Sequence, residues 1–344
     1  MKVLNTGRSN PDVPQLPPFV CPRCHGHLER ESEAYRCAPC NAHYPIVLGI
    51  PDFRVLPDPW IGLEDDRAKA RRLMQRVGSG SFEDAVRGYW EITPTTGSAM
   101  AARYIEHVLG AEARASEWLR WLAAQEPPAA PGCWLDIGCG TADLVSAGVA
   151  SDIVIVGVDI AMRWLVVAAR RASLAGRTAQ LVCANGEYLP FADGSFIRAL
   201  SLGTLEHCLD ADRVTAESHR VLQRGSLLRV RTVNRYSVLP EPHVNVWGVG
   251  LLPRRWADAY VRWRIGMRYV HHRPLSPREV RRGFWLAGFR HIDVGAAAML
   301  AADRARVPAA LRWTAALYER CRRMPLVAGV VRWIAPILDA RGIA

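Results

Sequence analysis

Lysine is almost missing from this sequence. Only two of its 44 basic residues are lysine, Lys2 and Lys69, and all the others are arginine. A lysine-rich stripe, which is common on nucleic-acid-binding surfaces, is therefore excluded. A bias in genome composition accounts equally well for part of the arginine excess, which weakens any argument from specific arginine recognition.

Long apolar runs are also absent. The first 14 residues contain no apolar stretch, so we expect no secretory signal. The longest apolar segment, residues 324–338, spans about 15 residues and contains Arg332, which makes it too short and too polar to cross a bilayer. We therefore expect a cytoplasmic protein.

The net charge of +11 is unevenly distributed along the chain. Residues 1–212 hold 20 basic and 25 acidic residues, a balance of −5, whereas residues 213–344 hold 24 and 8, a balance of +16. A basic C-terminal third predicts an anionic partner, which could be nucleic acid, a phospholipid surface or a phosphorylated substrate.

Composition and patterning divide the chain into segments. We expect a Pro-rich leader over 1–18, a β-rich unit over 19–55, a helical linker over 56–98, a main domain over 99–298 with an insertion at about 234–275, and an amphipathic helical extension over 299–344. Within the main domain, apolar runs alternate with helical stretches, which predicts an α/β fold with a parallel sheet covered on both faces.

Helix signals appear at several further places. We expect a charged helix over 63–77 and one long amphipathic helix over 98–124. Ser276-Pro277-Arg278-Glu279 combines an N-cap serine, a proline in the first turn and a glutamate three residues after the cap, which predicts another helix. The strand FRHIDV follows, and we find no convincing final strand after it.

Four of the nine cysteines form two CxxC pairs, Cys21 with Cys24 and Cys37 with Cys40, separated by twelve residues. Two such turns can direct four thiolates at one point and complete a closed tetrahedral zinc site of structural type. The surrounding segment 19–55, notably YRCAPCNAHYPIVLGIPDF, resembles the small zinc-ribbon proteins that activate tRNA and protein methyltransferases. The resemblance implies a folding partner for a catalytic domain; the alternative is a ribbon that grips nucleic acid.

A glycine turn follows the first apolar run of the main domain, in WLDIGCGT at residues 134–141. Two glycines let the backbone approach a ligand closely, and ligands bind at the carboxyl ends of parallel strands. Asp159 ends the next apolar run, where a carboxylate can accept hydrogen bonds from both ribose hydroxyls. The spacing also fits a nicotinamide enzyme, although GCGTAD lacks the third glycine of GxGxxG.

LDIGCGTADL resembles the first motif of the class I S-adenosylmethionine-dependent methyltransferase family, and the likeness extends over roughly residues 99–295. It implies a Rossmann-like seven-stranded sheet of order 3-2-1-4-5-7-6. It also implies that Asp136, Gly138 and Gly140 border the methionine and ribose portions of S-adenosylmethionine, and that Asp159 holds the ribose hydroxyls.

ANGEYLPFADGSF resembles the third motif of that family. Asn185 stands where the family usually has an aspartate contacting the adenine amino group, and Gly186 lies beside it. The asparagine carbonyl can accept the same hydrogen bond without the charge. After FADGSF the family's usual aspartate is replaced by Ile197.

Methyl transfer from a sulfonium requires mainly alignment of the nucleophile with the methyl carbon, and a base only if the nucleophile must lose a proton. His207, just past the fourth strand in LSLGTLEHCLD, is the first candidate base. His243, in the Pro- and Trp-rich insertion, is the second. For each, a packing role is the alternative, and the insertion itself is either a lid over the acceptor or a structural cap.

Three functions fit these residues. A small, apolar or lipid-like acceptor, including a natural product, is favoured by the Trp-rich insertion and by the tail PLVAGVVRWIAPIL, which suits an anionic membrane interface. An RNA methyltransferase acting on tRNA or rRNA is favoured by the ribbon and the basic C-terminal third. A non-catalytic cofactor-binding scaffold is the third. The residues give no indication of the oligomeric state or of the atom methylated.

Overall fold

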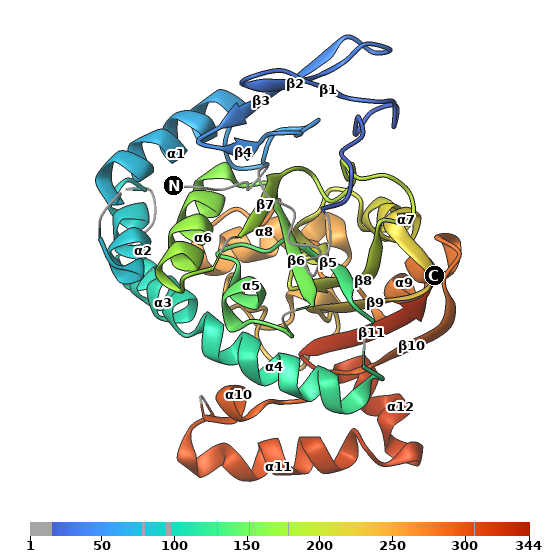
Figure 1. The fold of residues 1–344 in the computed structure, drawn as a ribbon. Coiled ribbons are helices and arrows are strands. Elements are labelled where there is room, and N and C mark those ends of the chain that lie inside the picture. The colour runs from blue at the N-terminus through green and yellow to red at the C-terminus, as the bar shows by residue number, and fades with distance from the viewer. Residues whose placement is uncertain are drawn as a thin grey trace. The chain divides into compact units, whose positions relative to one another are not determined.

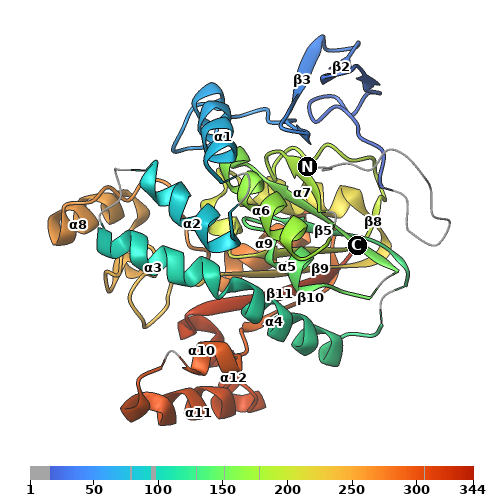
Figure 2. The same ribbon diagram turned by 60° about the vertical axis from the view of Figure 1, so that its left-hand side comes forward.

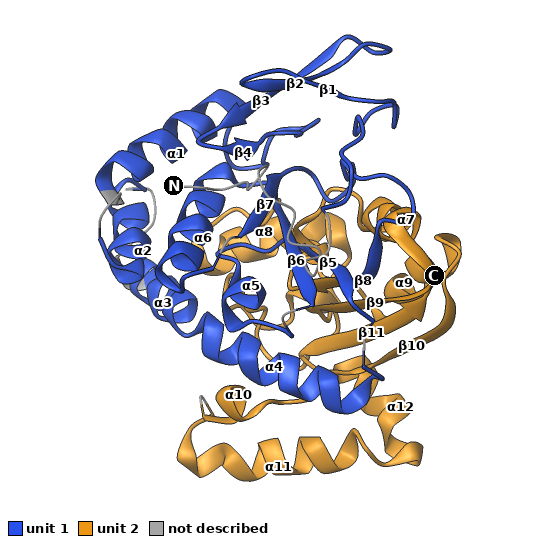
Figure 3. Cartoon of the chain, in the orientation of Figure 1, with its two compact units in different colours: residues 1–199 blue, residues 200–344 orange. Residues whose placement is uncertain are grey.

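The computed structural model describes residues 16–77, 80–93, 98–128, 130–150, 152–177, 179–305 and 307–344. The expected leader over residues 1–18 therefore lies almost wholly outside the described residues. The chain divides into two compact units, residues 1–199 and 200–344 (Figure 3).

A small antiparallel sheet begins the first unit. It has the order β1-β2-β3-β4, formed by β1 (Glu29–Arg30), β2 (Ala34–Cys37), β3 (Ala42–Val47) and β4 (Ile50–Pro51). The ring of Phe53 packs against those of Tyr35 and Tyr44, with centroids 5.2 and 5.4 Å apart, so aromatic contacts form the core of this small sheet. A β-rich unit over residues 19–55 was expected.

The large sheet has seven strands in the order β10-β11-β9-β8-β5-β6-β7. Its members are β5 (Gly132–Ile137), β6 (Ile153–Asp159), β7 (Gln180–Cys183), β8 (Phe196–Leu202), β9 (Leu222–Val233), β10 (Arg290–Ala296) and β11 (Ile337–Ile343). Counted from β5 in chain order, this arrangement is 3-2-1-4-5-7-6. The predicted Rossmann-like methyltransferase fold is therefore confirmed.

The helices of the first unit are α1 (Leu63–Val77), α2 (Phe82–Glu91), α3 (Ser98–Leu109), α4 (Ala111–Gln125), α5 (Asp143–Ala147) and α6 (Met162–Leu174). Both α1 and α2 pack against α6 (Figures 1 and 2). The single helix expected over 98–124 is instead two helices that meet at Gly110, the N-cap residue of α4. Glycine is a poor residue for a helix interior, which explains the break.

The second unit contains α7 (Ala211–Val221), α8 (Arg254–Ile265), α9 (Pro277–Leu286), α10 (Ala301–Ala305), α11 (Arg312–Cys321) and α12 (Pro325–Ile334), with 3-10 turns η1 (Leu205–His207), η2 (Val249–Leu251) and η3 (Ala309–Leu311). The predicted capping box of α9 is confirmed, because Glu279 N–H donates to Ser276 Oγ at 3.3 Å and Ser276 N–H donates to Glu279 Oε2 at 2.9 Å. Among the described residues, no helix combines the length and the apolar character that a membrane span requires.

The C-terminal end differs from the sequence-based expectation. Residues 337–343, which we assigned to a helical extension, form β11, and β11 pairs antiparallel with both β9 and β10. The missed strand, ILDARGI, contains charged residues that disguise its burial. Asp339 of β11 is only 8% exposed because Arg229 of β9 donates to its carboxylate at 2.8 Å.

Candidate functional site

The glycine turn lies directly after β5. Gly138 and Gly140 have φ angles of 76° and 50°, a left-handed conformation that glycine adopts without strain. A Cβ built on Gly140 would meet no atom within 4 Å, so the turn leaves space on that side. The N–H groups of Gly138 and Cys139 both donate to Val158 O, at 2.7 and 3.0 Å, which fixes the turn against β6.

Asp159 closes this turn from the end of β6. One carboxylate oxygen accepts a hydrogen bond from Gly140 N–H at 2.9 Å, and the other accepts one from Ala161 N–H at 2.8 Å. Each oxygen has a second lone pair, so both can still accept a hydrogen bond from a ligand hydroxyl. The structure thus brings together Gly138, Gly140 and Asp159, three of the predicted cofactor residues.

Asp136 lies at the end of β5 and is 4% exposed. Burial, and secondarily the negative charge of Asp159, raise its pKa from 3.8 to about 7. Burial also raises the pKa of Asp159, although the N–H groups of Ala161 and Gly140 oppose this shift. Two carboxyl groups that repel each other in a buried site favour a ligand that donates hydrogen bonds or carries positive charge.

Asn185 makes contacts that the sequence did not predict, and its place against the adenine stays a prediction. Its Oδ1 accepts hydrogen bonds from the N–H groups of Val55 (2.9 Å) and Leu56 (3.1 Å), and its Nδ2 donates to Leu56 O at 3.2 Å. Both lone pairs of the amide oxygen are therefore engaged by the segment that follows the small sheet. Gly186 follows in the loop after β7, and its predicted place beside the adenine stays a prediction.

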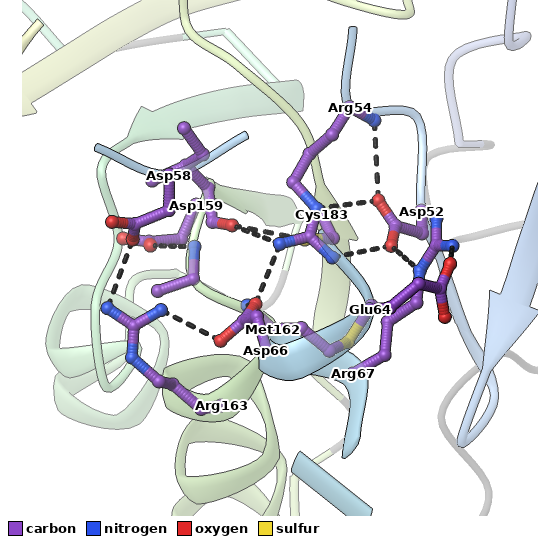
Figure 4. A network of polar contacts seen from close by, with 12 residues as sticks. Asp52, Arg54, Asp58, Glu64, Asp66, Arg67, Asp159, Met162, Arg163 and Cys183 are labelled. Carbon is purple, nitrogen blue, oxygen red and sulfur yellow. Dashed lines mark hydrogen bonds and ion pairs between the residues drawn. The ribbon is translucent and has the colours of Figure 1, made fainter. Parts of the chain in front are cut away.

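A buried network of charged side chains surrounds the start of α6 (Figure 4). At its centre is Asp66 of α1, which is 0% exposed. Its carboxylate accepts hydrogen bonds from Arg54 at 2.7 Å and from Arg163 at 2.8 Å. The backbone N–H of Met162 donates to the same carboxylate at 2.9 Å, and Arg54 also donates to Ile160 O at 3.1 Å.

Two further carboxylates complete the network. Arg54 contacts both oxygens of Asp52, at 2.8 and 2.6 Å, and Arg67 donates to Asp52 at 2.8 Å. Arg163 donates to Asp58 at 3.0 Å. Because buried charges are tolerated only when they are paired and hydrogen-bonded, this set of contacts holds residues 52–66 firmly against the loop that follows Asp159.

Backbone pairing adds to this attachment. Asp52 forms a parallel bridge with Cys183 of β7, and Phe53 N–H donates to Cys183 O at 2.7 Å. Val20 N–H donates to Pro190 O at 3.1 Å in the loop beyond. The contacts of Asp52 and Phe53 with Cys183 cover part of the edge of β7, which is the last strand of the large sheet on this side.

The four cysteines of the CxxC pairs converge. Their sulfur atoms all lie within 4.8 Å of one another, and the Sγ–Sγ distances are 3.3 Å for Cys21–Cys40, 3.5 Å for Cys24–Cys37 and 3.7 Å for Cys24–Cys40. Tetrahedral zinc with Zn–S bonds of about 2.3 Å requires sulfurs about 3.8 Å apart, so the set fits. Tyr44 Oη lies 3.3 Å from Cys21 Sγ and forms a hydrogen bond with this cysteine.

Three histidines of the second unit also converge. His207 ends η1, and His243 and His272 lie in the expected insertion; their ligand nitrogens lie within 4.8 Å of one another. Sequence reasoning named His207 and His243 but missed His272, whose only signal was the pair His271-His272 in the same insertion. Burial, followed by the charges of His243 and His207, lowers the pKa of His272 to about 3.

The charged network was also missed from the sequence. The acidic start of α1 was visible as Glu64-Asp65-Asp66, but a run of acids in a first helical turn ordinarily serves the helix itself. Arg163 follows Asp159 closely, yet no pattern links it to a carboxylate 97 residues earlier.

Comparison with known proteins bears on this region. Residues 135–230 match the family described as "Methyltransferase domain". The prediction of a methyltransferase domain is confirmed for this part of the chain. The matched segment contains the end of β5, all of β6, β7 and β8, and most of β9, and thus the glycine turn, Asp159 and Asn185.

The chain is similar to several methyltransferases over part of its length. It is 33% identical over 94 residues to the 18S rRNA (guanine-N(7))-methyltransferase of Schizosaccharomyces pombe, covering 27% of this chain and 34% of that protein. It is 24% identical over 159 residues to the ubiquinone biosynthesis O-methyltransferase of Brucella anthropi, covering 46% of this chain and 60% of that protein. The chain therefore spans less than two thirds of these relatives. A crystal structure of an S-adenosylmethionine-dependent methyltransferase from Thermotoga maritima is similar with a TM-score of 0.43 at 19% identity, covering 70% of this chain and 95% of that one.

Proposed function

We propose that this protein transfers a methyl group from S-adenosylmethionine to a small, apolar or lipid-like acceptor. The observation that carries the cofactor assignment is the contact of Asp159 with Gly140. Backbone N–H groups hold both oxygens of the Asp159 carboxylate, and the remaining lone pairs suit the two hydroxyls of a ribose. The match of residues 135–230 to methyltransferase domains supports the same assignment.

The residues of the chain would act mainly by binding and orientation. S-adenosylmethionine supplies a methyl group already activated by its sulfonium. The turn at Gly138 and Gly140 lets the backbone approach this cofactor, and the buried Asp136 carboxyl lies just before the turn. Asn185 would face the adenine through its second Nδ2 hydrogen, as a donor, because its oxygen is engaged by Val55 and Leu56 N–H.

We propose His207 or His243 as the group that accepts a proton when the acceptor must lose one. Their Nε2 atoms are 3.1 Å apart, so the two rings can share or pass a proton. Glu241 holds His243 from the other side, at 2.5 Å from Nδ1, and fixes the orientation of its ring.

Several features favour a small apolar acceptor. The insertion packs around its own apolar cluster of Val244, Val246, Val249, Ala257, Val261 and Tyr269. On α12, Leu326 is 94% exposed and Val330 is 61% exposed, which suits contact with an anionic lipid interface. At least eight arginines of the second unit pair with carboxylates of that unit, which reduces the positive charge available to RNA.

An RNA acceptor is the second candidate. The balance of +16 over residues 213–344 and the likeness to an rRNA methyltransferase favour it. An RNA enzyme should bind RNA tightly at low salt and lose affinity steeply as the salt concentration rises. Weak binding with a shallow salt dependence would favour the small acceptor.

Calorimetry tests the cofactor assignment. We expect wild-type protein to bind S-adenosylmethionine, and D159N to bind it roughly 10-fold to 100-fold more weakly, because a hydrogen bond to a charged group contributes about 1.5–3 kcal/mol. D193N, in an exposed loop of the same unit, is the matched control and should bind normally. Binding of a nicotinamide dinucleotide in place of S-adenosylmethionine would overturn the proposal.

Transfer of a labelled methyl group tests the acceptor. Purified protein and labelled S-adenosylmethionine are incubated with extract from a deletion strain, which is then separated into lipids, polar metabolites and RNA. Label in lipids or metabolites is the expected result, and label in RNA would establish the second candidate. Cofactor binding without transfer to any fraction would favour a cofactor-binding scaffold.

A further inference from the structure

We propose that His207, His243 and His272 bind a first-row divalent transition-metal ion, in addition to the zinc expected at the four cysteines. The three rings come from separate segments of the second unit, namely η1 and two loops of the insertion. Imidazole nitrogen is the ligand that zinc, nickel, copper and iron share, whereas magnesium and calcium prefer oxygen. The composition of the cluster therefore selects the class of metal.

The ligand nitrogens are close enough together to share one ion. One nitrogen from each ring lies within 4.8 Å of the other two. His207 Nε2 and His243 Nε2 are 3.1 Å apart, and His207 Nδ1 and His272 Nδ1 are 3.3 Å apart. A tetrahedral site with bonds of 2.0–2.1 Å requires ligand nitrogens about 3.3 Å apart. His207 faces His243 and His272 with different nitrogens, so its ring must rotate for one nitrogen to meet both neighbours at one ion.

Glu241 provides the outer contact that metal-binding histidines typically have. Its Oε1 is 2.5 Å from His243 Nδ1, which leaves His243 Nε2 directed toward His207. Glu241 is itself fixed, since its Oε2 accepts hydrogen bonds from the N–H groups of His243 (2.9 Å) and Val244 (3.0 Å). A carboxylate that orients the ring in this way also makes the ring a stronger ligand.

Backbone and buried contacts preorganise the rest of the cluster. The N–H of Arg273, next to His272, donates to the carbonyl oxygen of Glu206, next to His207, at 2.7 Å. The Glu206 side chain is 2% exposed and accepts a hydrogen bond from Thr232 Oγ1 at 2.7 Å. These contacts bring His207 and His272 together without requiring a metal to do so.

Three protein ligands leave a further coordination position open, as in catalytic rather than structural zinc sites. That position can take a water molecule or an oxygen of a ligand, and a bound hydroxyl oxygen becomes more acidic. Its use to bind a hydroxyl of the acceptor rests on the proposed methyl transfer; metal binding itself does not. With an ion bound, the coordinating nitrogens of His207 and His243 could not accept a proton, so the ion would take the place of the histidine base proposed above.

The metal content of purified full-length protein, measured by mass spectrometry after dialysis with zinc, tests the site. We expect H243A and H272A each to lose about one equivalent relative to wild type. H107A replaces an exposed histidine of α3 and is the matched control, expected to keep the wild-type content. Equal metal content in wild type, H243A and H272A would overturn the proposal.

Cobalt substitution separates the two metal sites even if a variant is destabilised. Cobalt bound by thiolates gives an intense charge-transfer absorption, whereas cobalt bound by imidazoles gives only ligand-field bands. H243A should retain the charge-transfer absorption of the cysteine site and lose the ligand-field bands of the histidine site. E241Q should weaken metal binding at the histidine site about 10-fold to 100-fold. An unchanged metal affinity in E241Q, together with unchanged ligand-field bands in H243A, would contradict the assignment. If the wild type binds the metal and H243A does not, but both transfer the methyl group at the same rate, the metal site is supported and its role in binding the acceptor is contradicted.

Discussion

Asp66 and Arg163, which are 97 residues apart in the sequence, form a buried ion pair with an N–O distance of 2.8 Å. Asp66 lies on α1, before the large sheet begins, and Arg163 lies in the first turn of α6, shortly after Asp159. The same Asp66 carboxylate accepts the backbone N–H of Met162. The pair therefore joins the N-terminal segment to the loop that follows Asp159, the proposed ribose-binding carboxylate.

Substitution D66N should destabilise the protein by about 3–5 kcal/mol, because it leaves the buried guanidinium groups of Arg54 and Arg163 without their shared carboxylate. Urea denaturation measures this difference. D65N alters the neighbouring, exposed residue of the same helix and should change the stability by no more than about 0.5 kcal/mol. Equal midpoints for D66N and D65N would show that the network contributes little.

Substitution C24S should abolish the thiolate-to-cobalt absorption and lower the melting temperature, because three thiolates do not close a tetrahedral structural site. Cys24 is exposed, so the loss would not arise from disturbed packing. C321S removes a thiol far along the chain, on α11, and should leave both the absorption and the melting temperature unchanged. A C24S protein with full thiolate absorption would exclude the expected zinc site.

The raised pKa of Asp136 predicts how stability depends on pH. The unfolded chain releases this proton near pH 3.8, whereas the folded protein retains it to about pH 7. Over that interval the folded state binds more protons, so the free energy of unfolding falls as the pH rises, by about 1.4 kcal/mol for each pKa unit. Denaturation of wild type and D136N at several pH values should show that D136N lacks this decline. Parallel curves would contradict the shift.

Substitution N185A should destabilise the protein, because the N–H groups of Val55 and Leu56 lose their acceptor at a cost of about 1–3 kcal/mol each. N185D keeps both acceptor contacts and should lose less. Denaturation together with S-adenosylmethionine titration separates the two roles of Asn185. Reduced cofactor affinity without reduced stability in N185A would assign it to the adenine rather than to residues 55 and 56.

The glycine turn and its carboxylate could be predicted because they are local signals. Gly138 and Gly140 directly follow one buried strand and Asp159 ends the next, and parallel strands bring such ends to one edge of a sheet. The CxxC pairs could be recognised equally well from the sequence, because short turns fix the direction of neighbouring thiolates. The strand order followed from the family resemblance rather than from hydrophobic periodicity.

The remaining contacts depend on residues far apart in the chain. The motif that assigns Asn185 to the adenine gives no sign that Val55 and Leu56 also reach this side chain. His272 was missed because only the fold brings it beside His207. The last strand was missed because Asp339 makes it look like surface, although Arg229 neutralises that charge in the interior.

The position of β11 also constrains the order of assembly. It is hydrogen-bonded between β9 and β10, yet it is the last of the three strands to leave the ribosome. Until residues 337–343 emerge, β9 and β10 lack the neighbour that separates them, and their unpaired edges are open to nascent-chain chaperones or to pairing with other chains. A fusion or truncation placed at this strand should therefore lower the yield of folded protein during synthesis.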